Sequence, residues 1–266
     1  TAITTGTRNV AVGFEALKTE DGDGRNVAVG YHALEDLNAG TNAFNIGIGY
    51  NGGANLTTGV QNVLIGGQAG VDLTDADQNV AIGYQSLFTD TLGSKSVAIG
   101  ANSLYSQSFT TATDSHNTAV GHAAGLSVTT GINNTLIGGL AGDALTDADN
   151  NVAMGKSALS ADTLGSNSTA IGRKALGTQN FTTATDAYNT AVGAFAGELV
   201  TTGLRNTLIG GLAGDAITTA TNNIALGYSS ISSNTTSSNN VAVGNLALNA
   251  FNITTGGDGY NVAVGT

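Results

Sequence analysis

The stretch NVAIGYQSLFTDTLGSKSVAIG, residues 79–100, begins and ends with nearly the same five residues. Each pentad has Asn or Ser first, a β-branched residue second, a small residue third, an aliphatic residue fourth and glycine fifth. The fifth positions, Gly83 and Gly100, define a 17-residue repeat. A repeat of this length is too short for a helical hairpin and fits one coil of a β-solenoid.

The pentad recurs along the whole chain of 266 residues. Most successive copies follow at a 17-residue interval, with one interval of 19 and three of 21, and the longer interval is always second in a block of four. The blocks are about 13–83, 83–155, 155–227 and a partial 227–266. The pattern predicts one continuous all-β solenoid over residues 1–266, with about 15 coils of ~17 residues, as a fragment of a longer chain. The fifth-position glycines are Gly13, Gly30, Gly49, Gly66, Gly83, Gly100, Gly121, Gly138, Gly155, Gly172, Gly193, Gly210, Gly227, Gly244 and Gly265.

Apolar residues occupy both faces of the strand that the pentad predicts. The second position is always Val, Thr or Ile and the fourth always Val, Ile, Leu or Met, so these side chains share one face. The third position, on the opposite face, is Ala in eleven copies, Leu in three and Gly in one. Such a strand is typical of burial on both faces. We expect one face to fill the coil and the small-residue face to approach another sheet, with two short strands per coil.

Two pentad positions, the fifth and the first, have a structural interpretation when their residues are compared along the chain; each such series of equivalent residues is called a column. The invariant glycine indicates a corner that needs a positive φ, or a backbone contact too close for a Cβ atom. The first-position asparagine suits a ladder in which each side chain bonds to its equivalent one coil along. Representative members of the two columns are Asn9, Gly13, Asn79, Gly83, Asn151, Gly155, Asn223 and Gly227.

Side-chain volume is exchanged between two positions of the coil. A site four residues after the pentad is bulky in two successive coils, as at Leu87 and Leu104, and Gly in the next two, as at Gly125 and Gly142. Leucine takes the third pentad position only in coils where this later site is Gly. We interpret the exchange as a way to keep packing volume constant, so no cofactor is needed to explain it.

Composition excludes several classes of function. A net charge of −11, with only 8 Lys and Arg residues, argues against nucleic acid, which requires a basic stripe. The absence of cysteine excludes disulfides and thiolate metal sites. No apolar run approaches the length of about 18 residues that spans a membrane, so no membrane insertion is predicted for this segment.

Two motifs resemble ligand sites but lack residues that such sites need. The doubled glycines of LIGGQAG (64–70) and LIGGLAG (136–142) mimic a phosphate loop, but neither the Lys-Ser pair nor the helix of such a loop follows. Asp75 and Asp77, with Asp147 and Asp149 one block later, are weak candidates for calcium ligands. The third copy has Thr at both positions, which favours solvated turns in which Asp side chains bond their own backbone.

No catalytic set recurs in the copies. His116 aligns with Tyr188 and Tyr260 in the 72-residue block, which is hard to reconcile with a general base. Serines and threonines are abundant, but no nucleophile, base and acid are kept together from one copy to the next. We therefore predict that the chain is not an enzyme.

The three coils with the longest interval carry extra residues outside the coil. Their sequences are YSQSFTTATDSHN (105–117), GTQNFTTATDAYN (177–189) and NAFNITTGGDGYN (249–261). Loops on a rigid scaffold often carry recognition, so a receptor or a glycan is the candidate partner. Alternatively, the aromatic rings cover the coil beneath or seal a neighbouring chain. The candidate partner-binding residues, expected to be exposed, are Phe109, His116, Phe181, Tyr188, Phe251 and Tyr260.

The pentads NVAVG, SVAIG, STAIG and NTAVG resemble the head repeats of trimeric autotransporter adhesins, and units such as NVAIGYQSL are similar to repeats in bacteriophage tail fibres. The resemblance covers essentially the whole chain. It implies a left-handed β-roll, packed in parallel as a homotrimer, on a virion or a bacterial cell surface. The 17-residue period is longer than that typical of adhesin heads, and the regular 72-residue block favours a phage fibre.

The favoured hypothesis is therefore a structural or adhesive fibre segment, a rigid extracellular spacer with receptor-binding loops. The head domain of a bacterial trimeric surface adhesin is the main alternative. An ice-binding solenoid is a third hypothesis, but adjacent threonines such as Thr57 and Thr58 point to opposite sides of a strand and cannot form one flat array. A calcium-dependent secreted repeat module is the fourth.

Overall fold

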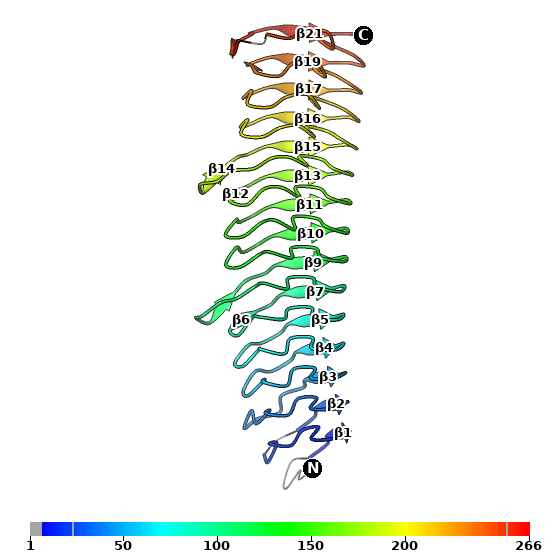
Figure 1. The fold of residues 1–266 in the computed structure, drawn as a ribbon, viewed down its shortest axis with the longest axis vertical. Helices are drawn as coiled ribbons and strands as arrows, with labels where there is room; N and C mark the ends of the chain where they lie inside the picture. The colour runs from blue at the N-terminus through cyan, green and yellow to red at the C-terminus, as the bar shows by residue number, and fades with distance from the viewer. Residues whose placement is uncertain (1–6, 23, 254) are drawn as a thin grey trace. The chain divides into compact units, whose positions relative to one another are not determined.

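The structure is a computed structural model that describes residues 7–22, 24–253 and 255–266. Every regular element in these residues is a β-strand, and none of them is helical. The chain forms a parallel β-solenoid of fifteen turns, each with one three-residue strand, and most turns follow the 17-residue period of the pentad (Figure 1). It divides into two compact units, Thr1–Asn133 and Asn134–Thr266.

Each coil of the first unit contributes one three-residue strand to a parallel sheet. Successive strands pair pentad to pentad, with Val80 opposite Val97 and Ile82 opposite Ile99. The strands are β1 (Val10–Val12), β2 (Val27–Val29), β3 (Ile46–Ile48), β4 (Val63–Ile65), β5 (Val80–Ile82), β6 (Gly93–Ser94), β7 (Val97–Ile99), β8 (Thr113–Asp114) and β9 (Thr118–Val120). The two-residue strands β6 and β8 pair with each other beside the extended coil.

The second unit repeats this arrangement. Its three-residue strands pair in the same register, with Val152 opposite Thr169. The strands are β10 (Thr135–Ile137), β11 (Val152–Met154), β12 (Gly165–Ser166), β13 (Thr169–Ile171), β14 (Thr185–Asp186), β15 (Thr190–Val192), β16 (Thr207–Ile209), β17 (Ile224–Leu226), β18 (Ser237–Ser238), β19 (Val241–Val243), β20 (Gly257–Asp258) and β21 (Val262–Val264). The two-residue pairs β12–β14 and β18–β20 again accompany the extended coils.

Each strand ends at the pentad glycine, which turns the chain. The fifteen corner glycines have φ between 130° and 141°, a region that side chains other than glycine rarely adopt. Successive glycines also touch one another, since a Cβ atom on Gly83 would lie 2.6 Å from the carbonyl carbon and oxygen of Gly100. The corner therefore needs glycine for both of the reasons that the sequence suggests.

The segment after the corner is not a second strand, and that expectation was wrong. Its residues two and four places after the glycine have left-handed φ values, 52° at Gln85 and 50° at Leu87. An extended strand cannot form through such residues. Their backbone N–H groups still donate to neighbouring coils, from Gln85 to Gly67 O at 3.0 Å and from Leu87 to Ser103 O at 3.0 Å.

The small-residue face of the strand fills the interior of its own coil. The third-position residues Ala81 and Ala98 in the first unit, and Ala153 and Ala170 in the second, are fully buried. The second and fourth positions point outward and are partly exposed. The expectation that the alanine face approaches another sheet was therefore wrong. The interior of this thin coil has room for only a methyl group at the third pentad position of most coils.

The exchange of volume between two positions is confirmed at Leu64. A Cβ atom on Gly53 would lie 2.5 Å from Leu64 Cδ1, and one on Gly70 would lie 2.8 Å from Leu64 Cδ2. The leucine side chain therefore occupies the space that the two missing side chains leave. In the second unit, Leu208 lies in the same way 2.7 Å from the Cβ positions of Gly197 and Gly214.

The asparagine column forms a buried ladder within each unit. Asn45 Oδ1 accepts the backbone N–H of Asn62 at 2.8 Å, and Asn45 Nδ2 donates to Gly59 O at 2.8 Å. In the second unit Asn206 Oδ1 accepts the N–H of Asn223 at 3.0 Å in the same manner. Each side chain therefore joins its own coil to the next and satisfies backbone groups that burial would otherwise leave unpaired.

Candidate functional site

The outward face of each unit's sheet is a row of mainly aliphatic side chains that repeats once per coil. Every second and fourth pentad position holds Val, Ile, Thr, Leu or Met, and none holds a charged residue. These side chains are partly exposed in most coils, and Met154, Ile209 and Ile224 are 37%, 41% and 39% exposed. Because the strands pair in register, the side chains form continuous rows along each unit. A continuous surface of this kind is a candidate for an interaction site.

The first extended coil is closed by a buried polar network rather than an open loop. Asp90 accepts the backbone N–H groups of Gly93 at 3.1 Å and Phe109 at 3.0 Å, and the side-chain amide of Gln107 at 2.6 Å. Gln107 Oε1 in turn accepts Asn117 Nδ2 at 2.9 Å. Burial raises the pKa of Asp90, although these hydrogen bonds act in the opposite direction. The network fixes the backbone at Phe109.

The ring of Phe109 is buried at 6% exposure, as is that of Phe181 in the equivalent coil. The second network has the same contacts, with Asp162 accepting Gln179 Nε2 at 2.6 Å and the N–H of Phe181 at 3.0 Å. The expectation that these two phenylalanines are exposed was wrong. They cover the coil beneath, which is the alternative that the sequence left open.

In the third extended coil, all three residue positions of this network hold different residues. Asn234 stands where Asp90 and Asp162 stand, Ser237 replaces the glycine, and Phe251 replaces the glutamine. Phe251 is only partly exposed and does not align with the buried phenylalanines, whose place is taken by Ile253. The aspartate and the glycine change together because they are in contact: a Cβ atom on Gly165 would lie 2.1 Å from Asp162 Oδ2.

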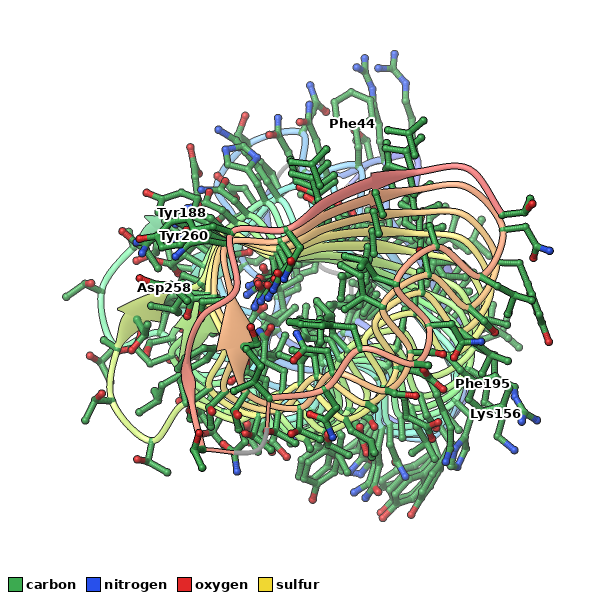
Figure 2. The ribbon with its side chains drawn as sticks, turned by 90° about the horizontal axis from the view of Figure 1, so that it is seen from above. Phe44, Lys156, Tyr188, Phe195, Asp258 and Tyr260 are labelled. Carbon is green, nitrogen blue, oxygen red and sulfur yellow. The ribbon has the colours of Figure 1, made fainter. Side chains whose placement is uncertain are left out.

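The tips of the extended coils present the remaining candidate residues to solvent. Tyr188 is 56% exposed and Tyr260 72% exposed, and His116 occupies the equivalent exposed place in the first unit. Each tyrosine hydroxyl donates to an aspartate, Tyr260 to Asp258 Oδ2 at 2.8 Å, and this bond raises the pKa of Tyr260. In the view along the coils, Tyr188, Tyr260 and Asp258 project on the same side of the second unit (Figure 2).

The candidate calcium ligands make hydrogen bonds between coils. Asp75 Oδ1 accepts Thr58 Oγ1 at 2.7 Å, and Asp77 Oδ1 accepts the N–H of Val60 at 2.8 Å. These bonds join adjacent coils and differ from the bonds to their own backbone that the sequence suggests. No three ligand-type side chains among the described residues gather around Asp75, Asp77, Asp147 or Asp149 at metal-binding distances.

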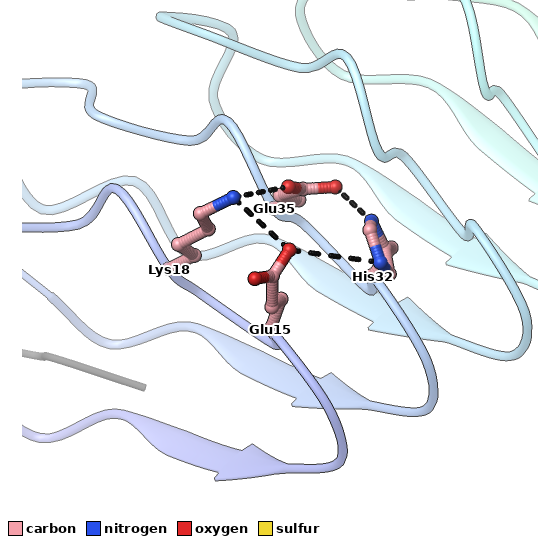
Figure 3. Close-up of polar contacts among 4 residues, drawn as sticks. All are labelled: Glu15, Lys18, His32 and Glu35. Atoms are coloured by element: carbon pink, nitrogen blue, oxygen red, sulfur yellow. Dashed lines mark hydrogen bonds and ion pairs between the residues drawn. The ribbon is translucent and has the colours of Figure 1, made fainter.

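One cluster of metal-ligand type was not anticipated from the sequence. Carboxylate and imidazole atoms of Glu15, His32 and Glu35 lie within 4.8 Å of one another. Lys18 Nζ already lies 3.0 Å from both Glu15 and Glu35, and His32 contacts both carboxylates (Figure 3). The hydrogen bonds to Glu35 and Glu15 raise the pKa of Lys18 to about 12. Burial raises the pKa of Glu35, but the bonds from Lys18 and His32 outweigh it and lower the pKa. The cluster acts as a salt-bridge network between coils, and a divalent cation would have to displace Lys18.

Two further carboxyl groups, Asp143 and Asp215, each have a buried Oδ1 atom without a hydrogen-bond partner. Burial raises the pKa of both groups. Val71, at the position of Asp143 in the preceding block, is 8% exposed and shows that the site accepts an aliphatic side chain. The aspartates are therefore a local cost to stability at neutral pH.

We expect Asp143→Val to stabilise the second unit by about 1 kcal/mol at pH 7. This value is the low end of the cost of leaving a buried polar atom without a hydrogen bond, because Asp143 is partly exposed. Because folding raises the pKa of Asp143, its contribution to the free energy of unfolding is most favourable below the ordinary pKa of 3.8. That contribution is lost as the pH rises through the raised pKa. The gain should therefore shrink on acidification. Urea unfolding at pH 7 and pH 4 measures it, with the exposed Asp36→Val as the control for loss of charge. An equal gain at both pH values would contradict the assignment.

The chain matches no known protein-family model and no curated protein sequence. Within the residues described, no helix has the length and apolar character needed to cross a membrane. Each unit thus presents an outward uncharged face and extended coils with exposed tips, and the first two of the three extended coils are closed by the buried aspartate network.

Proposed function

We propose that the chain is a segment of a homotrimeric fibre, in which left-handed β-rolls pack in parallel as a rigid extracellular spacer. The parent particle is a phage tail fibre, with a bacterial trimeric adhesin head as the alternative. The observation that carries the proposal is the outward face of the sheet, which is uncharged throughout, aliphatic at every fourth and most second pentad positions with threonine at the others, and partly exposed.

A second and third copy of the same chain are the partners that this face fits best. The face repeats once per turn, so only a surface with the same repeat can match it over many turns. Burying the exposed third of a Val or Ile side chain contributes roughly 0.5 to 1 kcal/mol, so about 15 to 30 side chains offset an association cost of up to about 15 kcal/mol. Most coils offer two such aliphatic positions, and the coils with threonine at the second position offer one. The number of copies, three, comes from the resemblance of the pentads to adhesin and tail-fibre repeats.

The mechanism is mechanical. Within each unit, the strand ladder and the asparagine column join every coil to the next by hydrogen bonds that are buried, and buried hydrogen bonds resist opening. The tips of the extended coils project from this scaffold with a tyrosine and an aspartate in the last two copies. These tips are where we place contact with a receptor or a glycan, since tyrosine is enriched at recognition surfaces.

The variant Ile82→Lys with Ile99→Lys tests the interface. It puts two charges in adjacent coils of the outward face, where the trimer would bury them without partners at a cost of several kcal/mol each. We expect the double variant to sediment as a single chain of 26.3 kDa and to keep its β-sheet circular dichroism. Thr110→Lys with Thr111→Lys, on the exposed part of the extended coil, is the control and should sediment like the wild type. An Ile82, Ile99 variant with unchanged mass would exclude this face as the interface.

A further inference from the structure

A pocket of about 100 Å³ in the second unit is lined by Lys156, Ser157, Arg173 and Lys174. These residues directly follow the corner glycines of two successive coils, after strands β11 and β13. Lys156 projects on the opposite side of the second unit from Tyr188 and Tyr260 (Figure 2). The pocket is thus separate from the tips of the extended coils.

The positively charged residues at this pocket have no charged equivalents in the neighbouring blocks of the repeat. Three of the chain's 8 Lys and Arg residues line it, although the net charge of the chain is −11. In the preceding and following blocks, the four equivalent positions hold no Lys or Arg, so the fold of the coil does not require a cation there. The equivalents are Tyr84, Gln85, Ala101 and Asn102 in one block, and Tyr228, Ser229, Asn245 and Leu246 in the other.

The three cations are held differently. The guanidinium of Arg173 lies 4.4 Å from the centre of the Phe195 ring, a cation–π contact that orients it. Lys174 Nζ donates to Glu198 Oε1 at 2.9 Å. Lys156 is exposed and has no polar side-chain partner among the described residues. Three cations and one carboxylate leave a local charge of about +2, which a partner interface would bury only at a high cost.

We infer that this pocket binds a phosphomonoester group. Such a group carries a charge of about −1.5 to −2 at pH 7, which matches the local charge better than a carboxylate or a sulfate ester does. At about 100 Å³ the half-open pocket has room for one tetrahedral oxyanion. The acidic remainder of the chain repels extended polyanions, so the group is carried by a small molecule, such as a phosphorylated saccharide, or is free phosphate.

Isothermal titration calorimetry on the full chain at low ionic strength tests the inference, with inorganic phosphate and glucose 6-phosphate as probes and glucose and acetate as controls. We expect both phosphates to bind in the millimolar range or tighter, and neither control to bind. Tighter binding of glucose 6-phosphate than of inorganic phosphate identifies a sugar ester as the ligand, and equal binding identifies the phosphate group alone.

The variant Lys156→Gln with Arg173→Gln should weaken phosphate binding by about tenfold or more. Lys95→Gln, which removes an exposed lysine far along the sequence, is the matched control and should bind like the wild type. Equal affinity in the double variant, equally tight binding of acetate, or no phosphate binding by the wild type would overturn the inference. The pocket lies within one chain, so these results are independent of whether the fibre proposal holds.

Discussion

Gly83→Ala should destabilise the first unit by at least about 3 kcal/mol, the upper part of the cost of one strongly strained residue. Gly83 has φ of 137°, and its new Cβ atom would lie 2.6 Å from the backbone carbonyl of Gly100. The obstacle is backbone in the adjacent corner, so no side-chain movement relieves it. The strain would pass to the neighbouring corners, because the glycines of successive coils touch.

Gly22→Ala is the matched control in the same unit. The nearest atom to its Cβ position is Gly40 Cα at 3.9 Å, so the methyl group has room. Denaturant unfolding of the two variants should show a large loss for Gly83→Ala and a change within about 0.5 kcal/mol for Gly22→Ala. Similar stabilities for the two variants would show that the corner does not depend on glycine.

Leu64→Ala should cost about 2 to 5 kcal/mol, because it leaves a cavity at a fully buried position. Gly70→Leu alone should also destabilise, since its Cβ atom would lie 2.8 Å from Leu64 Cδ2 and 2.9 Å from Leu73 Cδ1. The two changes together place Ala at the third position and Leu at the later one, the combination found at Ala81 and Leu87. Leu87 has φ of 50°, so leucine is accepted in the left-handed conformation of Gly70.

The double variant should therefore recover part of the stability that Leu64→Ala loses, because the cavity left by Leu64 gives room for the end of the Leu73 side chain to move away from the new leucine. A double-mutant cycle by denaturant unfolding measures the coupling between the two sites, which the exchange of volume predicts to be favourable and larger than about 1 kcal/mol. Additive losses would mean that the alternation of Leu and Gly along the chain has another cause.

The sequence predicts the pentad strands and their register, because the 17-residue spacing leaves one way to stack the pentads, but it wrongly suggests a second strand in each coil. It does not predict which face turns inward, since the pentad is apolar on both faces. The interior position of Ala81 follows only from the small size of the coil. Nor does it predict the left-handed backbone at Gln85 and Leu87, because neither residue type is typical of positive φ.

Burial of Phe109 could have been predicted from the copies of the extended coil. Asp90, Gly93 and Gln107 recur together in the second block and are all replaced together in the third. Such joint replacement indicates contact among the three side-chain positions. The cationic pocket leaves a similar signal, since Lys156 and Arg173 break the repeat where the coil has no need of charge.

Sedimentation equilibrium of the intact 266-residue chain tests the central claim most directly. If the outward apolar face joins three copies, the measured mass will be three times 26.3 kDa, about 79 kDa, and independent of concentration over the micromolar range. A mass of 26.3 kDa throughout that range would show that the apolar face needs no partner and would contradict the account.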